Sequence, residues 1–189
     1  MRFHFASLLL PALMMGSADF PIGSKISEIT VHDGDKQVVF TPSKAMLTVV
    51  IFTSVQCPIS NSYNERMNEL YRDYSGKNIQ LIYVNANANE SSDQVEQHAK
   101  ANGLMFKVYK DAGNALADRL GASVTPETYV FDQGGTLLYH GYIDDSTNAV
   151  RVHVHGLRDA IEAVIAGRPV AMKEARSFGC TIKRVRKSS

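Results

Sequence analysis

The chain has 189 residues, of which 44% are hydrophobic and 21% charged, and its formal net charge is +1. These values are ordinary for one soluble globular domain, and the charge balance gives no reason to expect nucleic acid or an acidic membrane surface as a partner. Two cysteines are too few for a disulfide-dense scaffold. They predict either one structural bridge or one redox couple.

Residues 1–18 have the pattern of a secretory signal peptide. A basic start precedes an apolar run, residues 5–15, which is too short to span a bilayer and is followed by small residues. We expect cleavage after Ala18 and an exported chain that is periplasmic or secreted, with no stable membrane insertion. The alternative is a buried first strand or helix, which Pro11 disfavours.

The rest of the chain alternates between predicted strands and helices. Segments 26–31 and 36–40 flank Asp33-Gly34, which is typical of a β-hairpin turn, and the β-branched run 46–52 is typical of a strand buried on both faces. The other expected elements, in chain order, are a helix over 63–74, a strand over 79–84, a helix from Ser91 to Gly103, a short strand at 108–109, a helix over 113–120, strands over 128–131 and 137–143, and a helix over 157–166. This order predicts an α/β fold in which helices cover both faces of a mixed sheet.

Cys57 stands where the buried strand 46–52 ends and a helix begins. The first amide N–H groups of a helix lack internal partners and carry partial positive charge, so they favour a thiolate over a thiol. A lowered pKa makes the sulfur a nucleophile or a soft metal ligand. Pro58 suits the first turn of that helix. The alternative is a buried, inert cysteine.

Two segments resemble a known family. FTSVQCPIS at residues 52–60 resembles the active-site loop of thioredoxin-like redoxins, and VTPETYVFDQGG at residues 124–135 resembles their cis-proline loop and the hairpin after it. The resemblance covers roughly residues 22–183. It is closest to the alkyl hydroperoxide reductase and thiol-specific antioxidant group, in particular an exported subgroup with CPxSN, GxIDD and GCxIK motifs, which this chain carries at residues 57–61, 141–145 and 179–183.

This resemblance implies a thioredoxin fold, a three-layer α/β/α sandwich with an N-terminal β-hairpin, over residues 19–183, followed by a basic tail at 184–189. It implies that Cys57 is the nucleophile and that Thr125 and a cis Pro126 stand against its sulfur and bind a partner peptide. A trans proline in an ordinary turn remains the alternative. Ser60 occupies the position of the second cysteine of dithiol thioredoxins, and its hydroxyl can donate a hydrogen bond to a Cys57 thiolate.

Cys180 follows the last predicted helix in a segment that reads as a flexible tail. It can fold back and resolve a sulfenic acid or mixed disulfide on Cys57, form a permanent bridge with it, or remain unpaired. The peroxiredoxin loop PxxxTxxC is incomplete, since Val50 and Ser54 replace its proline and threonine. Arg119 and Arg151 are candidates for the peroxiredoxin arginine only by their place in the chain.

The sequence therefore predicts a thiol oxidoreductase that acts on a disulfide-bearing protein or a hydroperoxide, is reduced by an external dithiol, and needs no cofactor or metal. The alternative is a non-enzymatic copper-handling module of the same fold. His153 and His155 flank one residue, so their rings can point to one side and form a metal pair with a soft thiolate. They also suit a polar loop before a helix.

Overall fold

A computed structural model describes residues 20–186, so the predicted signal peptide lies outside the described residues. Its main element is a seven-stranded mixed sheet in the order β2-β1-β5-β4-β3-β7-β8. These strands are β1 (Ile29–Asp33), β2 (Lys36–Phe40), β3 (Leu47–Thr53), β4 (Ile79–Asn85), β5 (Val108–Lys110), β7 (Glu127–Asp132) and β8 (Leu137–Gly141). A separate two-stranded ladder joins β6 (Val124–Thr125) to β9 (Cys180–Thr181).

Strand β3 lies inside the sheet and ends at the loop that leads to Cys57. It pairs parallel with β4 and antiparallel with β7, and all seven of its residues are buried. Because successive side chains point to opposite faces, Val49 and Ile51 enter one hydrophobic cluster while Val50 and Phe52 enter the other. A strand of this composition is stable only between two covering layers.

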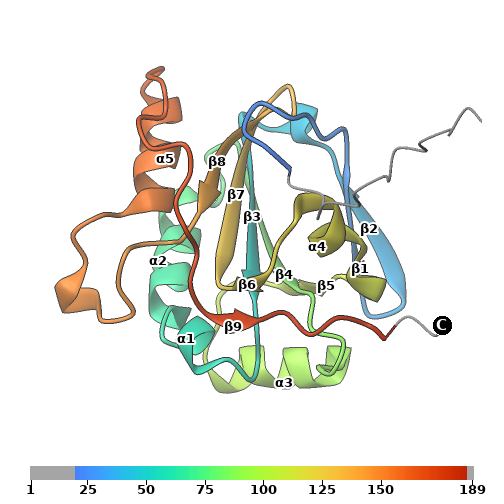
Figure 1. Ribbon diagram of the computed structural model, residues 1–189. Helices are drawn as coiled ribbons and strands as arrows, with labels where there is room; N and C mark the ends of the chain where they lie inside the picture. The colour runs from blue at the N-terminus through green and yellow to red at the C-terminus, as the bar shows by residue number, and fades with distance from the viewer. Residues whose placement is uncertain (1–19, 187–189) are drawn as a thin grey trace, which may run out of the picture.

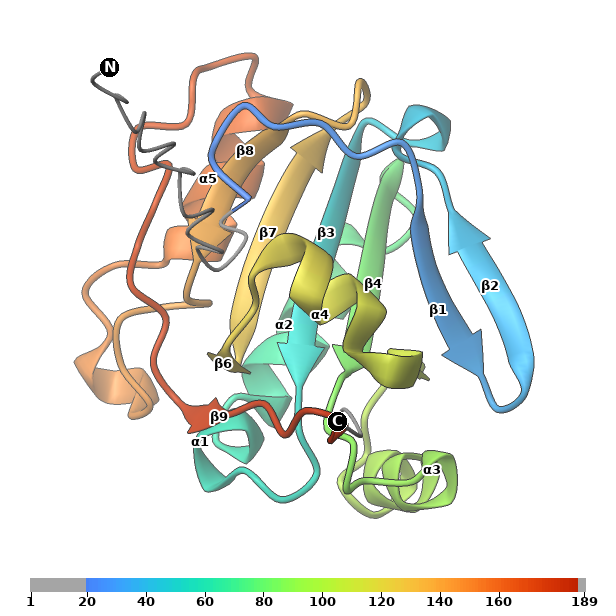
Figure 2. The same cartoon turned by 45° about the vertical axis from the view of Figure 1, so that its right-hand side comes forward.

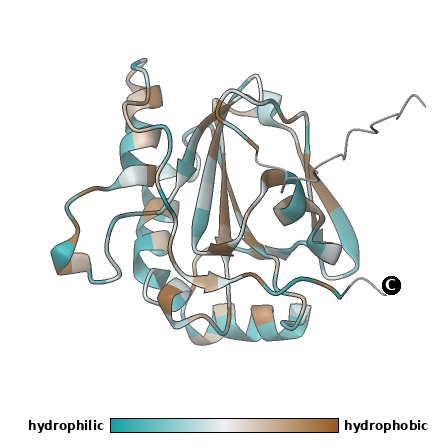
Figure 3. Cartoon of the chain, in the orientation of Figure 1, coloured by the Kyte–Doolittle hydropathy of each residue, from teal (hydrophilic) through white to brown (hydrophobic). Residues whose placement is uncertain are grey.

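Helices supply those layers. They are α1 (Pro58–Asn61), α2 (Asn64–Tyr74), α3 (Ser92–Ala101), α4 (Ala115–Leu120) and α5 (Gly156–Ile165). Helices α2 and α5 pack on one face of the sheet and α4 on the other, which Figures 1 and 2 show from two sides. Hydrophobic residues gather on the central strands between these layers (Figure 3). This is the predicted three-layer sandwich.

The predicted mixed sheet and N-terminal hairpin are confirmed, with strand ends displaced by up to three residues. The hairpin turn places Gly34 at φ +58°, and the Ser91–Gln94 capping box opens α3. The flexible tail predicted around Cys180 is wrong, because that segment forms β9 beside β6. Among residues 20–186, no helix combines the length and apolarity that crossing a membrane requires.

Candidate functional site

Cys57 is the N-cap residue of α1, and its sulfur faces the start of that helix. Its Sγ accepts a hydrogen bond from the Ser60 amide at 3.3 Å, and its own amide donates to Ser54 Oγ at 3.1 Å. The side chain is only 2% exposed. The predicted helix-start environment is therefore present, but a substrate must displace part of the protein to reach the sulfur.

The loop before β7 stands directly against this sulfur. The peptide bond between Thr125 and Pro126 is cis, as predicted. In the thiol form Cys57 donates to the Thr125 carbonyl oxygen at 3.4 Å. The Thr125 hydroxyl is buried without a hydrogen-bond partner among the described residues, and it lies close enough to lower the pKa of Cys57. It is therefore free to donate to a thiolate.

Strand β9 brings the second cysteine to the same place. Cys180 pairs with Thr125 in the antiparallel ladder of β6 and β9, so the tail crosses α1 beside Cys57 (Figures 1 and 2). Gly179 allows this approach, because a Cβ atom there would lie 1.9 Å from the Thr125 carbonyl oxygen. Both cysteines are free thiols.

The two thiols are neighbours, and their pKa values are shifted in opposite directions. Burial raises the pKa of Cys57, but hydrogen bonds from the Cys180 thiol, the Ser60 amide, the Thr125 side chain and the Cys180 amide outweigh it, so the pKa lies below its ordinary value. For Cys180, the interaction with Cys57 and then burial raise the pKa. These shifts favour ionisation of Cys57 before that of Cys180.

Buried Glu127 holds the cis-proline loop in shape. One carboxylate oxygen accepts from the amides of Ser123 and Val124 at 2.7 and 3.1 Å, and the other contacts His140 Nε2 at 2.6 Å. Burial raises the pKa of Glu127, but the hydrogen bonds from His140 and these amides hold it below its ordinary value. The carboxylate thus fixes the backbone on which Thr125 sits.

Sequence reasoning missed Glu127 and a second buried carboxylate, Glu90, which binds the loop before Cys57. For Glu90 a signal existed. The carboxamide-rich run Asn85 to Glu90 follows a strand parallel to the one that leads to Cys57, and the carboxyl ends of parallel strands meet at one edge of a sheet. For Glu127 the sequence offered only its place after Pro126.

Ser60 contributes to the site through a different atom from the one expected. Its backbone N–H contacts Cys57 Sγ, whereas its hydroxyl oxygen accepts from the Ser54 amide at 3.1 Å. Of the candidate arginines, Arg119 donates to the Glu28 carbonyl from α4, and Arg151 lies in an exposed turn. The hydrogen bonds found at Cys57 within residues 20–186 come from no arginine side chain.

The candidate metal residues lie in the segment before α5. The His153 amide donates to Asp145 Oδ1, and His155 is the residue before α5, beside Arg66 and Arg158. Within the part of the chain that the structure describes, no group of three or more His, Cys, Asp or Glu side chains is placed to hold a metal ion.

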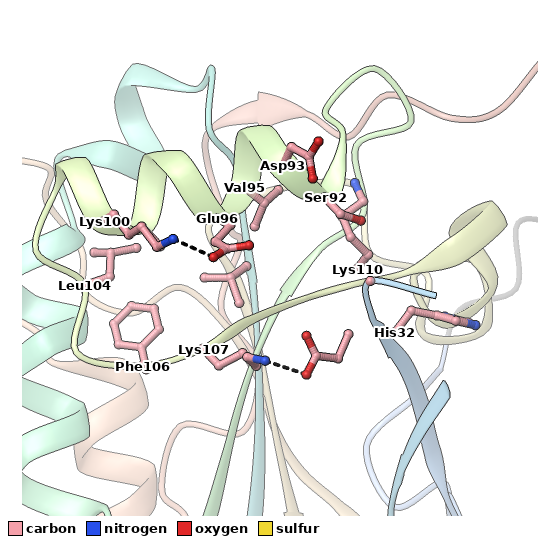
Figure 4. A pocket seen from close by; sticks show the side chains of 14 residues that line it. His32, Ser92, Asp93, Val95, Glu96, Lys100, Leu104, Phe106, Lys107 and Lys110 are labelled. Carbon is pink, nitrogen blue, oxygen red and sulfur yellow. Dashed lines mark hydrogen bonds and ion pairs between the residues drawn. The ribbon is translucent and has the colours of Figure 1, made fainter. Parts of the chain in front are cut away.

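A hollow of about 410 Å³ lies beside α3 and β5, away from the cysteines (Figure 4). Four of its charged side chains are already paired: Lys100 with Glu96, and Lys107 with Asp33. Lys110 also lines it, but its ammonium group donates to three oxygens of the chain segment 85–90. Asp93, in the exposed first turn of α3, also lines the hollow, and among the described residues this single carboxylate does not define a ligand.

The chain is similar in sequence to a known protein family and in fold to solved structures. The model of the AhpC/TSA family matches residues 22–140. A curated protein of Halalkalibacterium halodurans, Thiol-disulfide oxidoreductase ResA, is 28% identical over 108 residues, which are 57% of this chain and 53% of ResA, so the match spans about half of that relative.

Two crystal structures align over nearly the whole fold. An uncharacterized conserved protein from Geobacillus kaustophilus has a TM-score of 0.80 and 28% identity, and the alignment covers 96% of this chain and 100% of that one. A hypothetical protein from Sinorhizobium meliloti has a TM-score of 0.79 and 28% identity, with 90% and 98% covered.

Proposed function

Since the chain belongs to the AhpC/TSA family, whose members are thiol peroxidases or thiol–disulfide oxidoreductases, we propose that it catalyses thiol–disulfide exchange with Cys57 as nucleophile and Cys180 as resolving thiol. The observation that carries the proposal is the pairing of Cys180 with Thr125 across β6 and β9, which sets two free thiols side by side. Their opposite pKa shifts favour Cys57 as the attacking thiol and Cys180 as the resolving one.

The reaction begins when the Cys57 thiolate attacks one sulfur of a substrate disulfide. That S–S bond breaks, the second substrate sulfur leaves as a thiolate and takes up a proton, and a mixed disulfide remains on Cys57. Cys180 then loses its proton and attacks Cys57 Sγ, which releases the first substrate sulfur. The substrate has gained two electrons, and the protein holds a Cys57–Cys180 disulfide that an external dithiol reduces.

Two features favour a disulfide over a hydroperoxide as the substrate. The Ser54 hydroxyl donates to Glu90 at 2.8 Å, so it is not free to bind a peroxide oxygen. No arginine side chain is among the hydrogen-bonding partners of Cys57 in residues 20–186. A cation beside the sulfur would stabilise the charge that develops on a peroxide oxygen as the O–O bond breaks.

The test follows the mixed disulfide by mass spectrometry. Reduced wild-type protein, Cys57→Ser and Cys180→Ser are each treated with oxidised glutathione. We expect Cys180→Ser to keep a glutathione adduct on Cys57, wild type to release the adduct as its internal disulfide forms, and Cys57→Ser to react slowly. A wild-type protein that keeps the adduct as long as Cys180→Ser would overturn the resolving role.

A second arm decides the substrate class. The second-order rate constants for Cys57 with oxidised glutathione and with hydrogen peroxide are compared at the same pH. The proposal predicts efficient exchange and a peroxide rate no greater than that of a small-molecule thiol of equal pKa. A peroxide rate far above that reference would reassign the protein to the thiol peroxidases.

We also propose that the protein works after export, in the periplasm or outside the cell. This proposal rests on the charged start and short apolar run of residues 1–18. N-terminal sequencing of the chain from a bacterial periplasmic fraction should give a start at Asp19. A chain that keeps Met1 and stays in the cytoplasmic fraction would contradict it.

A further inference from the structure

The segment before Cys57 is bound by one buried carboxylate. Glu90, which is 3% exposed, accepts through Oε1 from the Ser54 hydroxyl at 2.8 Å and the Gln56 amide at 2.9 Å, and through Oε2 from the Val55 amide at 3.0 Å. Ser54 Oγ in turn accepts from the Cys57 amide. The Ser54 hydroxyl therefore links the Glu90 carboxylate to the backbone of Cys57 through two hydrogen bonds in series.

The same carboxylate is joined to the chain that carries the other cysteine. Asn87 Nδ2 donates to Glu90 Oε2 at 3.3 Å, and Asn87 Oδ1 accepts from the Lys183 amide at 2.8 Å. The Lys183 carbonyl accepts from the Ala88 amide at 2.9 Å. Lys183 follows Cys180 by three residues, so the segment 87–90 is bound on one side to the Cys57 loop and on the other to the chain just after β9.

This connecting segment is itself held rigidly. The Lys110 ammonium group donates to Asn85 Oδ1 at 2.7 Å, to the Asn87 carbonyl at 2.9 Å and to the Glu90 carbonyl at 2.6 Å. Burial raises the pKa of Glu90, but the hydrogen bonds that it accepts outweigh burial and keep the side chain ionised. A charged acceptor makes stronger hydrogen bonds than a neutral one.

We propose that Glu90 is a positioning residue for both cysteines, since its carboxylate fixes the loop before Cys57 directly and the strand of Cys180 through Asn87. This inference rests on the proposed function for its consequence, which is favourable closure of the Cys57–Cys180 disulfide. Glu90 contacts neither sulfur among the hydrogen bonds of the described residues. Its effect is to hold both thiols at the separation that closure requires.

The variant Glu90→Gln tests this role, because glutamine has nearly the same volume as glutamate. An amide group replaces one carboxylate oxygen, so an N–H donor then faces the backbone or hydroxyl donors of the Ser54–Gln56 loop, and at least one hydrogen bond is lost. The matched control is Glu96→Gln, which removes an equal charge from the exposed Glu96–Lys100 pair on α3. Asn87→Ala removes the side-chain hydrogen bonds to the Lys183 amide and to Glu90 Oε2. It leaves the hydrogen bond between Ala88 and Lys183 and the contacts of Glu90 with the Cys57 loop.

The experiment has two readouts. The first is the equilibrium constant for the internal disulfide against glutathione, measured in the full chain. The second is the pH profile of Cys57 alkylation by iodoacetamide in a Cys180→Ser background, which needs no disulfide. Circular dichroism melting shows whether each variant is folded at the assay temperature.

We expect Glu90→Gln to lower the equilibrium constant about tenfold, the effect of one lost hydrogen bond, and to move the alkylation profile to higher pH. Asn87→Ala should lower the equilibrium constant without moving the profile, and Glu96→Gln should change neither. Profiles and constants for Glu90→Gln that match wild type would overturn the inference. A wild-type chain that forms no internal disulfide would instead overturn the proposed function, and the alkylation arm would still decide the role of Glu90.

Discussion

Gly179→Ala should separate the two cysteines without touching either of them. A Cβ atom at this position would lie 1.9 Å from the Thr125 carbonyl oxygen and 2.7 Å from its carbon, and contacts below 3.0 Å do not occur for real Cβ atoms. The obstacle is backbone, so no side-chain rotation relieves it. Strands β6 and β9 must move apart by about 1 Å, which breaks hydrogen bonds between them.

The size of the effect follows from those hydrogen bonds. Each is worth about 1 kcal/mol, so losing about two weakens the docking of β9 by about 2 kcal/mol, or about 30-fold in its equilibrium constant. The seven-stranded sheet does not include β9, so the free energy of unfolding should fall by no more than this amount. The equilibrium constant for the Cys57–Cys180 disulfide against glutathione should fall about 30-fold.

The assay measures accessibility as well as disulfide formation. Cys57 is 2% exposed with β9 docked, so its alkylation by iodoacetamide should accelerate in Gly179→Ala once the pH is high enough to ionise the thiol fully. Gly134→Ala is the control, because the nearest atom to its Cβ is a side-chain oxygen of Asp132 at 3.2 Å. Equal alkylation rates and equal disulfide stability in wild type and Gly179→Ala would refute the claim that β9 covers and pairs with the nucleophile.

Three further predictions test other parts of the account. Cys180→Ala should raise the pKa of Cys57, because it removes the Cys180 thiol, the strongest of the hydrogen bonds that lower this pKa, and thiolate absorbance against pH measures the shift. Arg66→Ala should lower the free energy of unfolding, measured in urea, by about 3 kcal/mol. The Asp144 carboxylate, which is 3% exposed and lies 2.6 Å from the guanidinium, would lose its charged partner. Glu127 has a depressed pKa in the folded state, so its ionised carboxylate contributes to the free energy of unfolding at neutral pH. This contribution declines as the pH falls below about 4.3, the ordinary pKa of glutamate, and is gone below the folded pKa. Unfolding of Glu127→Gln, measured over the same acid range, should therefore show a weaker dependence of the unfolding free energy on pH.

Local patterns predicted the framework well. The β-branched run before Cys57 gave β3, and the Ser91–Gln94 capping box gave the start of α3, whereas the cis peptide bond before Pro126 was predicted from the resemblance of residues 124–135 to the redoxin cis-proline loop. Each of these features depends on residues close together in the chain. Periodicity and capping report such features directly.

Contacts between distant segments were harder to predict. Strand β9 has only two residues, and its partner β6 lies more than 50 positions earlier, so no local alternation identifies it. Glu90 was not singled out from the sequence, because glutamate is seldom fully buried without partners and the loop that it binds before Cys57 lies 34 to 36 positions away. The exchange of roles between the Ser60 amide and hydroxyl depends on the geometry of a single turn.

The central claim is that Cys57 and Cys180 form one redox couple. Its most direct test is a peptide map of the native, full-length chain after oxidation by glutathione disulfide. The account predicts one cross-linked species that joins the peptides of Cys57 and Cys180 and disappears on mild reduction. Separate glutathione adducts on the two cysteines, with no cross-link at any glutathione ratio, would contradict it.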